Sequence, residues 1–119
     1  MRCLVTGAGG FIGSTLTDRL LADGHDVVGF DDFSTGQPEF LAEAGQDPRF
    51  RLIRGDVLDA DALRPAVAGC DTVFHLAAHA DVRSGLDDPR VDLERNLLAT
   101  STVLEAMRAE GVSRIAFTS

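Results

Sequence analysis

Three glycines near the start of the chain, Gly7, Gly10 and Gly13, have the spacing of a phosphate-binding turn. They follow a short apolar run and precede a segment whose apolar residues recur at helical spacing. Gly7 permits the positive φ of a tight turn, Gly10 lets a phosphate approach the backbone, and Gly13 lets a helix lie close to a sheet. The free N–H groups and the dipole at the start of such a helix attract an anion. The pattern predicts a pyrophosphate site for a dinucleotide; the alternative is a purely structural turn.

An acidic residue, Asp31, lies about 20 residues beyond the last of these glycines, at the end of the next apolar run. Its carboxylate would accept hydrogen bonds from both hydroxyls of an adenosine ribose and would repel a 2′-phosphate. Neither Ala8 nor Gly9 supplies an arginine that would neutralise such a phosphate. The sequence therefore favours NAD over NADP, and the alternative is a solvated acid at a strand end.

Further contacts with a nucleotide are expected at four other places, each with a structural alternative. Asp32 and Ser34 would reach the ribose or phosphates, as would Thr35 and Gly36, or they form an ordinary turn. Asp56 would accept a hydrogen bond from the adenine amino group while the Val57 N–H faces a ring nitrogen, or Asp56 caps the next helix. Small residues would place a flat cofactor against the backbone or simply pack there: Leu76, Ala77 and Ala78. Asn96 would orient a loop or the cofactor ribose, or pack in the core.

The histidines do not indicate a metal site, because no Cys or carboxylate lies at ligand spacing to them. His25 falls in an exposed turn, His75 falls inside a strand as a hydrogen-bonded core residue, and His79 enters a loop where it would meet a substrate. The chain contains no Tyr and no Lys. These absences exclude a Walker-type phosphate loop, Schiff-base chemistry on Lys and proton transfer by Tyr within these residues.

The composition indicates one globular domain of 119 residues, 45% of them hydrophobic. No apolar run approaches the roughly 20 residues that span a bilayer, and no signal peptide precedes the first apolar run, so a cytoplasmic protein is expected. The net charge is −8 and the arginines are scattered, which argues against nucleic acid or an anionic membrane as a partner. Cys3 and Cys70 are expected to be core residues rather than a disulfide.

Short apolar runs alternate with segments of helical periodicity, and this alternation predicts βαβ units. The expected strands are Cys3–Val5, Val27–Phe30, Arg51–Ile53, Val73–Leu76 and Ile115–Phe117. The expected fold class is α/β, a Rossmann-type doubly wound parallel sheet of about five strands in the order 3-2-1-4-5 that stops after the fifth strand. A ligand crevice then lies between strands one and four, at their carboxyl ends.

Helices are expected after the glycine turn, from Asp59 to Val67 and from about Arg90 to Glu110, ending at Gly24, Gly69 and Gly111. Two apolar stripes are predicted to face the core. On the first helix the stripe is Phe11, Ile12, Leu16 and Leu20, and on the long helix it is Leu93, Leu97, Leu104 and Met107. The segment 32–48 is expected to be a loop with one helical turn around residues 39–44.

In order and spacing, these motifs resemble those of the extended short-chain dehydrogenase/reductases. They are most similar to the NAD-dependent sugar-nucleotide epimerases and dehydratases, the UDP-glucose 4-epimerase type. The matching motifs are Thr6-Gly7-x-x-Gly10-x-x-Gly13, Asp31-Asp32, Gly55-Asp56-Val57, His75-Leu76-Ala77-Ala78, Asn96 and Phe117-Thr118-Ser119. The likeness runs through the whole chain.

The resemblance implies a role for each matched position. It implies a pyrophosphate turn made by Gly7, Gly10, Phe11, Ile12 and Gly13. It implies a ribose contact at Asp31 and an adenine contact at Asp56 and Val57. Beside the nicotinamide half it implies a shelf made by Leu76, Ala77 and Ala78. Asn96 becomes a structural or cofactor-side contact, and Asp32 stands where many members of the family have Asn.

Enzymes of this family oxidise a sugar carbon by hydride transfer to NAD and then reduce, or eliminate at, the resulting ketone. Their Tyr-x-x-x-Lys pair, a nearby Ser or Thr and a sugar-binding domain lie beyond the fifth strand. Ser119 falls close to the position of that hydroxyl, but we assign no catalytic residue in this chain. Residues 1–119 are therefore expected to be a partial NAD(P)-binding Rossmann domain, inactive alone. The full-length enzyme is expected to bind a nucleotide sugar and to form a homodimer.

Two other functions remain open from the sequence. One is a non-catalytic NAD-binding module or sensor of the atypical short-chain dehydrogenase type. The other is a steroid or flavonoid reductase of the same superfamily, which would prefer NADP and is therefore disfavoured by Asp31.

Overall fold

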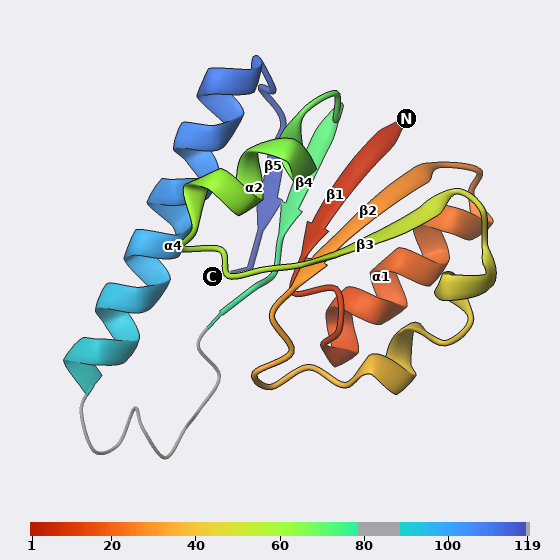
Figure 1. The fold of residues 1–119 in the computed structure, drawn as a ribbon, viewed down its shortest axis with the longest axis horizontal. Helices are drawn as coiled ribbons and strands as arrows, with labels where there is room; N and C mark the ends of the chain where they lie inside the picture. Colours follow the sequence, from red (N-terminus) through yellow and green to blue (C-terminus); the bar gives the residue numbers. More distant parts are fainter. Residues whose placement is uncertain (79–88, 119) are drawn as a thin grey trace.

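A five-stranded parallel sheet forms the centre of the computed structural model, which describes residues 1–78 and 89–118 (Figure 1). Its strands are β1 (Arg2–Thr6), β2 (Asp26–Asp31), β3 (Phe50–Arg54), β4 (Thr72–His75) and β5 (Ile115–Phe117). They lie in the order β3-β2-β1-β4-β5, and every neighbouring pair is parallel. The predicted Rossmann-type order is confirmed. His79 and Ser119 lie outside the described residues.

Helices cover both faces of the sheet (Figure 1). One face carries α1 (Phe11–Ala22) and two short 3₁₀ helices, η1 (Pro38–Leu41) and η2 (Ala44–Gln46). The other face carries α2 (Ala60–Val67) and α4 (Pro89–Glu110). The loop expected over residues 32–48 thus contains two short helices rather than one turn.

Each face of the sheet has its own hydrophobic core, because successive side chains of a strand point to opposite faces. Cys3 and Val5 of β1 pack with Leu20 and Leu21 of α1. Leu4, between them in the sequence, packs on the other side, with residues of α2 and α4. The two cysteines are free and buried, as expected, and burial raises the pKa of both thiols.

The helix ends follow the local signals of the sequence. The Asp59 carboxylate accepts hydrogen bonds from the amides of Asp61 and Ala62, so it caps α2 as expected. The glycines expected to end the helices, Gly24, Gly69 and Gly111, all have a positive φ. His25, predicted to be exposed, is half-buried in the turn between α1 and β2.

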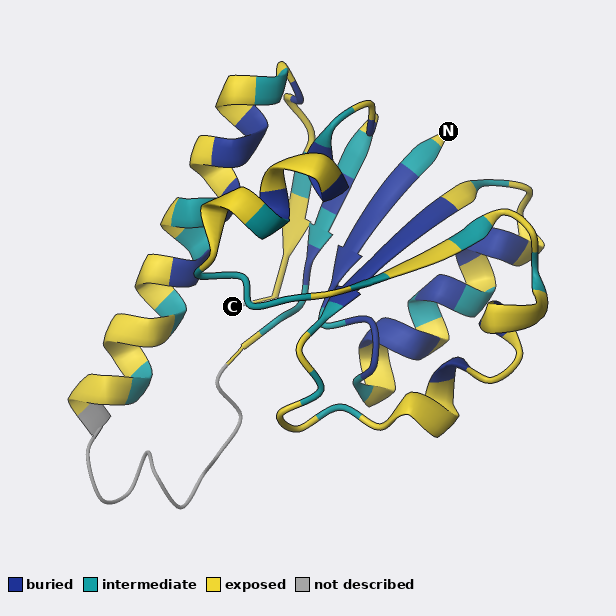
Figure 2. Cartoon of the chain, viewed as in Figure 1, coloured by how far each residue is buried: buried dark blue, intermediate teal, exposed yellow. Residues whose placement is uncertain are grey.

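The apolar stripe predicted for the first helix is wrong at its start. Phe11 and Ile12 are 74% and 63% exposed, because the first turn of α1 lies at the carboxyl ends of the strands and not over the face of the sheet (Figure 2). The buried face consists instead of Gly13, Ser14, Thr17, Leu20 and Leu21. Thr17 can be buried because its hydroxyl donates a hydrogen bond to the Gly13 carbonyl, 2.8 Å away.

The stripe predicted for the long helix is wrong at three of its positions. Leu93, Leu97 and Leu104 are exposed, and Met107 is buried. The buried face of α4 consists of Ala99, Val103, Ala106 and Met107. Small residues on this face let α4 lie close to its neighbours, while the first half of the helix extends past the ends of the strands (Figure 1).

A pair of matched variants tests which face of α4 packs. Met107→Ala removes a buried side chain, so we expect it to lower the free energy of unfolding of this chain by about 2–5 kcal/mol. Leu104→Ala removes an exposed side chain of similar size from the same helix. It should change the free energy of unfolding by less than about 1 kcal/mol. Urea denaturation followed by circular dichroism measures both. Equal losses would contradict the orientation of the helix.

Candidate cofactor-binding site

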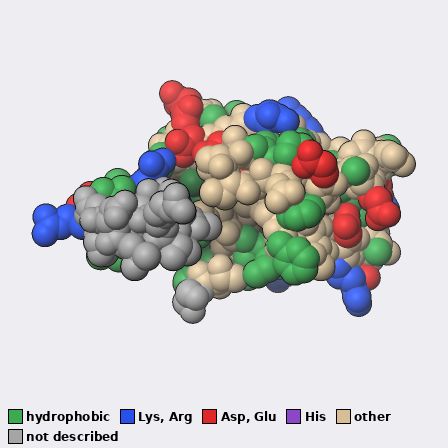
Figure 3. All heavy atoms as spheres, turned by 90° about the horizontal axis from the view of Figure 1, so that it is seen from below, with side chains coloured by type: hydrophobic (Ala, Val, Ile, Leu, Met, Phe, Trp, Pro, Cys, Tyr) green, Lys and Arg blue, Asp and Glu red, His purple; other side chains and the backbone are tan. Residues whose placement is uncertain are grey.

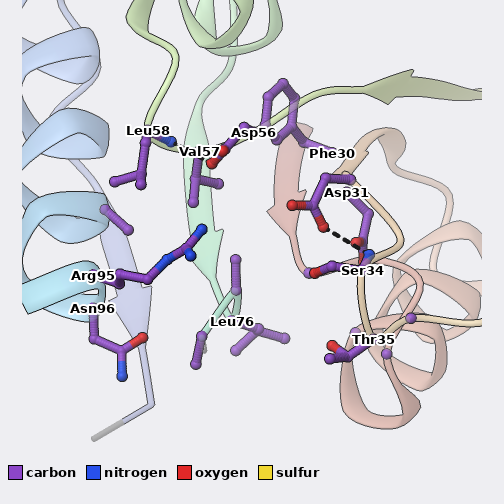
Figure 4. Close-up of a pocket in the computed structure, with 18 of the residues that line it drawn as sticks. Phe30, Asp31, Ser34, Thr35, Asp56, Val57, Leu58, Leu76, Arg95 and Asn96 are labelled. Atoms are coloured by element: carbon purple, nitrogen blue, oxygen red, sulfur yellow. Dashed lines mark hydrogen bonds between the residues drawn. The ribbon is translucent and has the colours of Figure 1, made fainter. Parts of the chain in front are cut away.

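The carboxyl ends of the strands border a cavity of about 270 Å³. Figure 3 views the molecule from this side, where hydrophobic side chains lie beside backbone and acidic groups. Figure 4 shows labelled side chains entering the cavity from β2, from the segment after β3, and from α4. The predicted site residues that line it are Gly7, Gly10, Ile12, Gly13, Asp31, Asp32, Ser34, Asp56, Val57, Leu76, Ala77, Ala78 and Asn96. The cavity lies at the switch point between β1 and β4, where a ligand crevice was expected.

Phe11 is the one predicted site residue that is not among the lining residues. Its ring is mostly exposed and lies edge-to-face against Phe40, with the ring centroids 6.4 Å apart. Its carbonyl oxygen accepts hydrogen bonds from the hydroxyls of Ser14 and Thr15. The Phe11 side chain therefore points away from the cavity, and only its backbone belongs to the glycine turn.

The glycine turn between β1 and α1 has no room for side chains at two of its positions. Gly7 has a φ of 73°, and a Cβ atom there would lie 2.8 Å from the Ala77 amide nitrogen. A Cβ on Gly13 would overlap the Gly7 carbonyl oxygen. Gly7 thus lets the turn pack against the segment that follows β4, and Gly13 lets α1 pack against the turn itself.

The start of α1 is free of competing groups. Gly10 is the N-cap residue, no side chain caps the helix, and the first turn contains no acidic residue. The first N–H groups of a helix have no acceptor within the helix. Those of Ile12 and Gly13 belong to residues that line the cavity, so they and the positive end of the dipole are available to an anion.

Asp31 ties the end of β2 to the glycine turn. One carboxylate oxygen accepts a hydrogen bond from the Gly9 amide and the other from the Phe33 amide, both at 2.8 Å. Phe33 adopts a left-handed φ of 60°, and its ring covers Gly9, where a Cβ would lie 2.5 Å from the ring. The Arg54 guanidinium lies 4.6 Å from the centre of that ring. Each Asp31 oxygen keeps a second acceptor position, which suits the two hydroxyls of a ribose.

Asp32 and Asp56 each stabilise a turn at the cavity edge. The Asp32 carboxylate accepts a hydrogen bond from the Ser34 amide at 2.9 Å, so the ordinary turn considered for these residues is present. The Asp56 carboxylate accepts one from the Leu58 amide at 2.9 Å. Asp59, not Asp56, caps α2, and the Asp56 side chain remains at the cavity.

A chain of hydrogen bonds links β1, β4 and α4 behind the cavity. The Thr6 hydroxyl oxygen accepts hydrogen bonds from the amides of Leu76 and Ala77, both at 3.1 Å. Its own hydrogen then points to His75 Nδ1, 2.7 Å away, which must be unprotonated. The other ring nitrogen, Nε2, therefore carries the proton and faces the Thr100 hydroxyl at 3.4 Å, which in turn donates to the Asn96 carbonyl. His75 is thus a core residue, as predicted.

The family-specific profile of the NAD-dependent epimerase/dehydratase family matches residues 3–119, nearly the whole chain. The chain belongs to this family. UDP-glucose 4-epimerase of Mycolicibacterium smegmatis is 46% identical over 125 residues, which cover 100% of this chain and 38% of that protein. The chain therefore spans less than two-fifths of the length of this relative.

Solved structures agree with this assignment. A dTDP-glucose 4,6-dehydratase from Streptomyces venezuelae, with NAD bound, superimposes with a TM-score of 0.88 at 35% identity and covers 97% of this chain and 38% of its own. UDP-glucose 4-epimerase from Thermus thermophilus, in complex with NAD, gives a TM-score of 0.80 at 36% identity. The match covers 97% of this chain and 36% of the Thermus chain. These matches support an NAD-dependent epimerase/dehydratase domain with a Rossmann fold.

The residues at the cavity of this epimerase/dehydratase domain fit NAD. The start of α1 is uncapped, the Asp31 oxygens keep acceptor positions, and Gly7 and Gly13 admit no side chain. No group of three or more His, Cys, Asp or Glu side chains in residues 1–78 and 89–118 is placed to hold a metal ion. No helix in that part of the chain is long and apolar enough to span a membrane.

The sequence reasoning missed several lining residues, namely Phe30, Gly55, Leu58, Arg95, Ala99 and Thr118. One of them had a signal in the sequence. Ala99 follows Asn96 by three residues, so helical spacing places it on the same face as Asn96. Gly55 lies against the Phe30 ring, where a Cβ would be 2.8 Å from it, and this contact exists only in the folded chain.

The neutral His75 makes stability depend on pH. Burial lowers the pKa of His75 in the folded chain, whereas in the unfolded chain it titrates near 6.5. The unfolded chain therefore binds more protons below pH 6.5, so the stabilisation is complete above that pH and is lost as the pH falls towards the lowered pKa. As the pH falls below 6.5 we expect an added loss in the free energy of unfolding of at most about 1.4 kcal/mol per pH unit.

His75→Gln, which cannot titrate, is the matched variant. It keeps the other two histidines, so only the contribution of His75 should disappear from the pH dependence of the free energy of unfolding. Urea denaturation at half-unit pH intervals measures the free energy of unfolding of both proteins. Parallel pH profiles would show that His75 is not the titrating group.

Proposed function

We propose that this chain is the NAD-binding portion of a sugar-nucleotide epimerase or dehydratase, in which hydride passes between NAD and a sugar carbon of a nucleoside-diphosphate sugar. The observation that carries the proposal is the meeting, in one cavity, of the uncapped start of α1 and the Asp31 carboxylate. The related epimerases and dehydratases support the choice of reaction. The solved UDP-glucose 4-epimerase of Thermotoga maritima, with UDP-glucose bound, supports the substrate class.

The residues of this chain bind and orient the cofactor. Backbone amides around Ile12 and Gly13 bind the pyrophosphate, and Asp31 accepts hydrogen bonds from the adenosine ribose. Asp56 and Val57 meet the adenine edge. Bound NAD supplies the hydride acceptor, and a shelf beside the nicotinamide half consists of Leu76, Ala77 and Ala78. Asn96 lies on the α4 side of the same cavity.

The division of labour follows from what the chain contains. It has no Tyr and no Lys, so the Tyr-x-x-x-Lys chemistry of the family is not carried by residues 1–119. We infer that this domain binds NAD and alone has no epimerase activity. Because Cys3 and Cys70 are free and buried, we also infer a cytoplasmic protein.

A second candidate function is a non-catalytic NAD-binding module or sensor, because the cavity described above would bind NAD equally well in either kind of protein. The two functions differ in one measurement on the full-length protein. An epimerase or dehydratase converts UDP-glucose or dTDP-glucose and transiently reduces its NAD, whereas a sensor binds NAD without reducing it. Absorbance at the NADH band and product analysis by chromatography distinguish them.

Asp31 provides the test of cofactor binding and selectivity. We expect NAD to bind more tightly than NADP, because the carboxylate repels a 2′-phosphate. Asp31→Ala should weaken NAD binding by about 1–3 kcal/mol, through the loss of hydrogen bonds to a charged group. The substitution should also reduce the preference for NAD over NADP, because the carboxylate that repels the 2′-phosphate is gone. Isothermal titration calorimetry with each dinucleotide measures both effects.

Asp26→Ala is the matched control, because it removes the same charge from the exposed opposite end of β2. It should leave both affinities unchanged. Asp31→Asn keeps an oxygen that can accept the Gly9 amide, and so separates turn stability from ribose binding. Equal affinities for NAD and NADP in the parent protein would contradict the role of Asp31.

We also propose that the full-length protein is a homodimer, with α4 at the interface. Five of its apolar side chains are exposed, at Val91, Leu93, Leu97, Leu98 and Leu104. Large apolar side chains exposed in this number on one helix suit a protein interface. Sedimentation velocity of the full-length protein should show a dimer that Leu97→Glu weakens at least about tenfold, because a buried charge is costly. A monomer at all concentrations would refute the proposal.

A further inference from the structure

Arg95 is the only positively charged residue among the described residues that line the cavity. The other charged lining residues are carboxylates: Asp31, Asp32 and Asp56. The chain as a whole carries a net charge of −8. A lone cation in such surroundings has no evident part in the fold, so its place at the cavity calls for a functional reason.

The Arg95 side chain is directed into the cavity. Figure 4 shows it extending from α4 towards the space between Val57 and Leu76. No hydrogen bond or ion pair engages its guanidinium within residues 1–78 and 89–118. By contrast, Arg108, farther along the same helix, is paired with Glu105 at 2.9 Å. Arg95 is thus exposed and free to contact a ligand.

The position of Arg95 relative to the rest of the site decides which part of a dinucleotide it meets. The pyrophosphate site at the start of α1 lies on the side of Ser34 and Thr35, across the cavity from α4 (Figure 4). The adenine edge belongs to Asp56 and Val57, on the side that Arg95 faces. The surfaces around that position are largely apolar, with Val57, Leu58 and Leu76 among them. A planar guanidinium suits a flat base there, because arginine stacks on the faces of nucleobases.

We propose that Arg95 is a cofactor-binding residue whose guanidinium stacks on the adenine of NAD and covers it from the α4 side. This inference rests on the proposed NAD-binding function. Plane-on-plane stacking on a base requires the flat shape of the guanidinium as well as its charge. An ion pair with a phosphate requires only the charge. The two kinds of contact therefore respond differently to lysine and to salt.

The test uses the full-length protein with three substitutions and two probes, NAD and ADP. Arg95→Ala should weaken the binding of both probes about five- to thirty-fold. Arg95→Lys should recover little of this loss, because an ammonium cannot stack as a plane. The loss should be similar at low and at high salt, where an ion pair with phosphate would be screened. Arg108→Ala removes the same charge from the same helix outside the cavity and should bind both probes like the parent.

Isothermal titration calorimetry supplies the affinities, and thermal melting without ligand shows that each variant is folded. Unchanged binding by Arg95→Ala would overturn the inference. Full recovery by Arg95→Lys, or a loss that disappears at high salt, would also overturn it, because either result indicates a phosphate contact. If the parent chain itself fails to bind NAD, the proposed function is wrong, and this result is separate from any effect of Arg95.

Discussion

The Asp31 carboxylate accepts hydrogen bonds from the Gly9 and Phe33 amides, at 2.8 Å each, and so joins the end of β2 to the turn that begins α1. Every other feature of the site depends on this junction. The turn must be held in place for the start of α1 to face the cavity. The same carboxylate retains acceptor positions, so in the proposed binding mode one side chain both shapes the glycine turn and binds the ribose.

The site also shows how an acidic protein can bind an anion. The chain carries a net charge of −8, and carboxylates line the cavity. In the proposed binding mode the pyrophosphate is attracted by short-range groups, namely the amides and the dipole at the start of α1. The backbone fixes the positions of these groups, so they do not depend on the charges of the surrounding side chains. The proposed selection of NAD by the carboxylates is therefore compatible with binding of an anion.

A second junction connects the two halves of the sheet. Thr6 of β1 binds the amides that follow β4, and His75 carries the connection on to Thr100 of α4. Gly7 makes the same approach possible from the backbone side, because a side chain there would collide with Ala77. The segment after β4, Leu76 to Ala78, is therefore positioned by β1 and by α4 together. This explains why a buried, neutral histidine lies at a strand end.

The sequence alone determined the strand order, the glycine turn, the helix ends and most of the lining residues, since these follow from local rules. A tight turn with a positive φ favours glycine at position 7, and parallel strands bring their carboxyl ends to one side of the sheet. Only the tertiary structure decided which face of each helix is buried. Leu93 and Leu97 match a core stripe by spacing, yet they are exposed because the first half of α4 extends past the ends of the strands. The helix packs instead through Ala99, Val103, Ala106 and Met107. Arg95 was missed for a related reason: periodicity describes one helix, whereas a cavity is formed by several elements that meet.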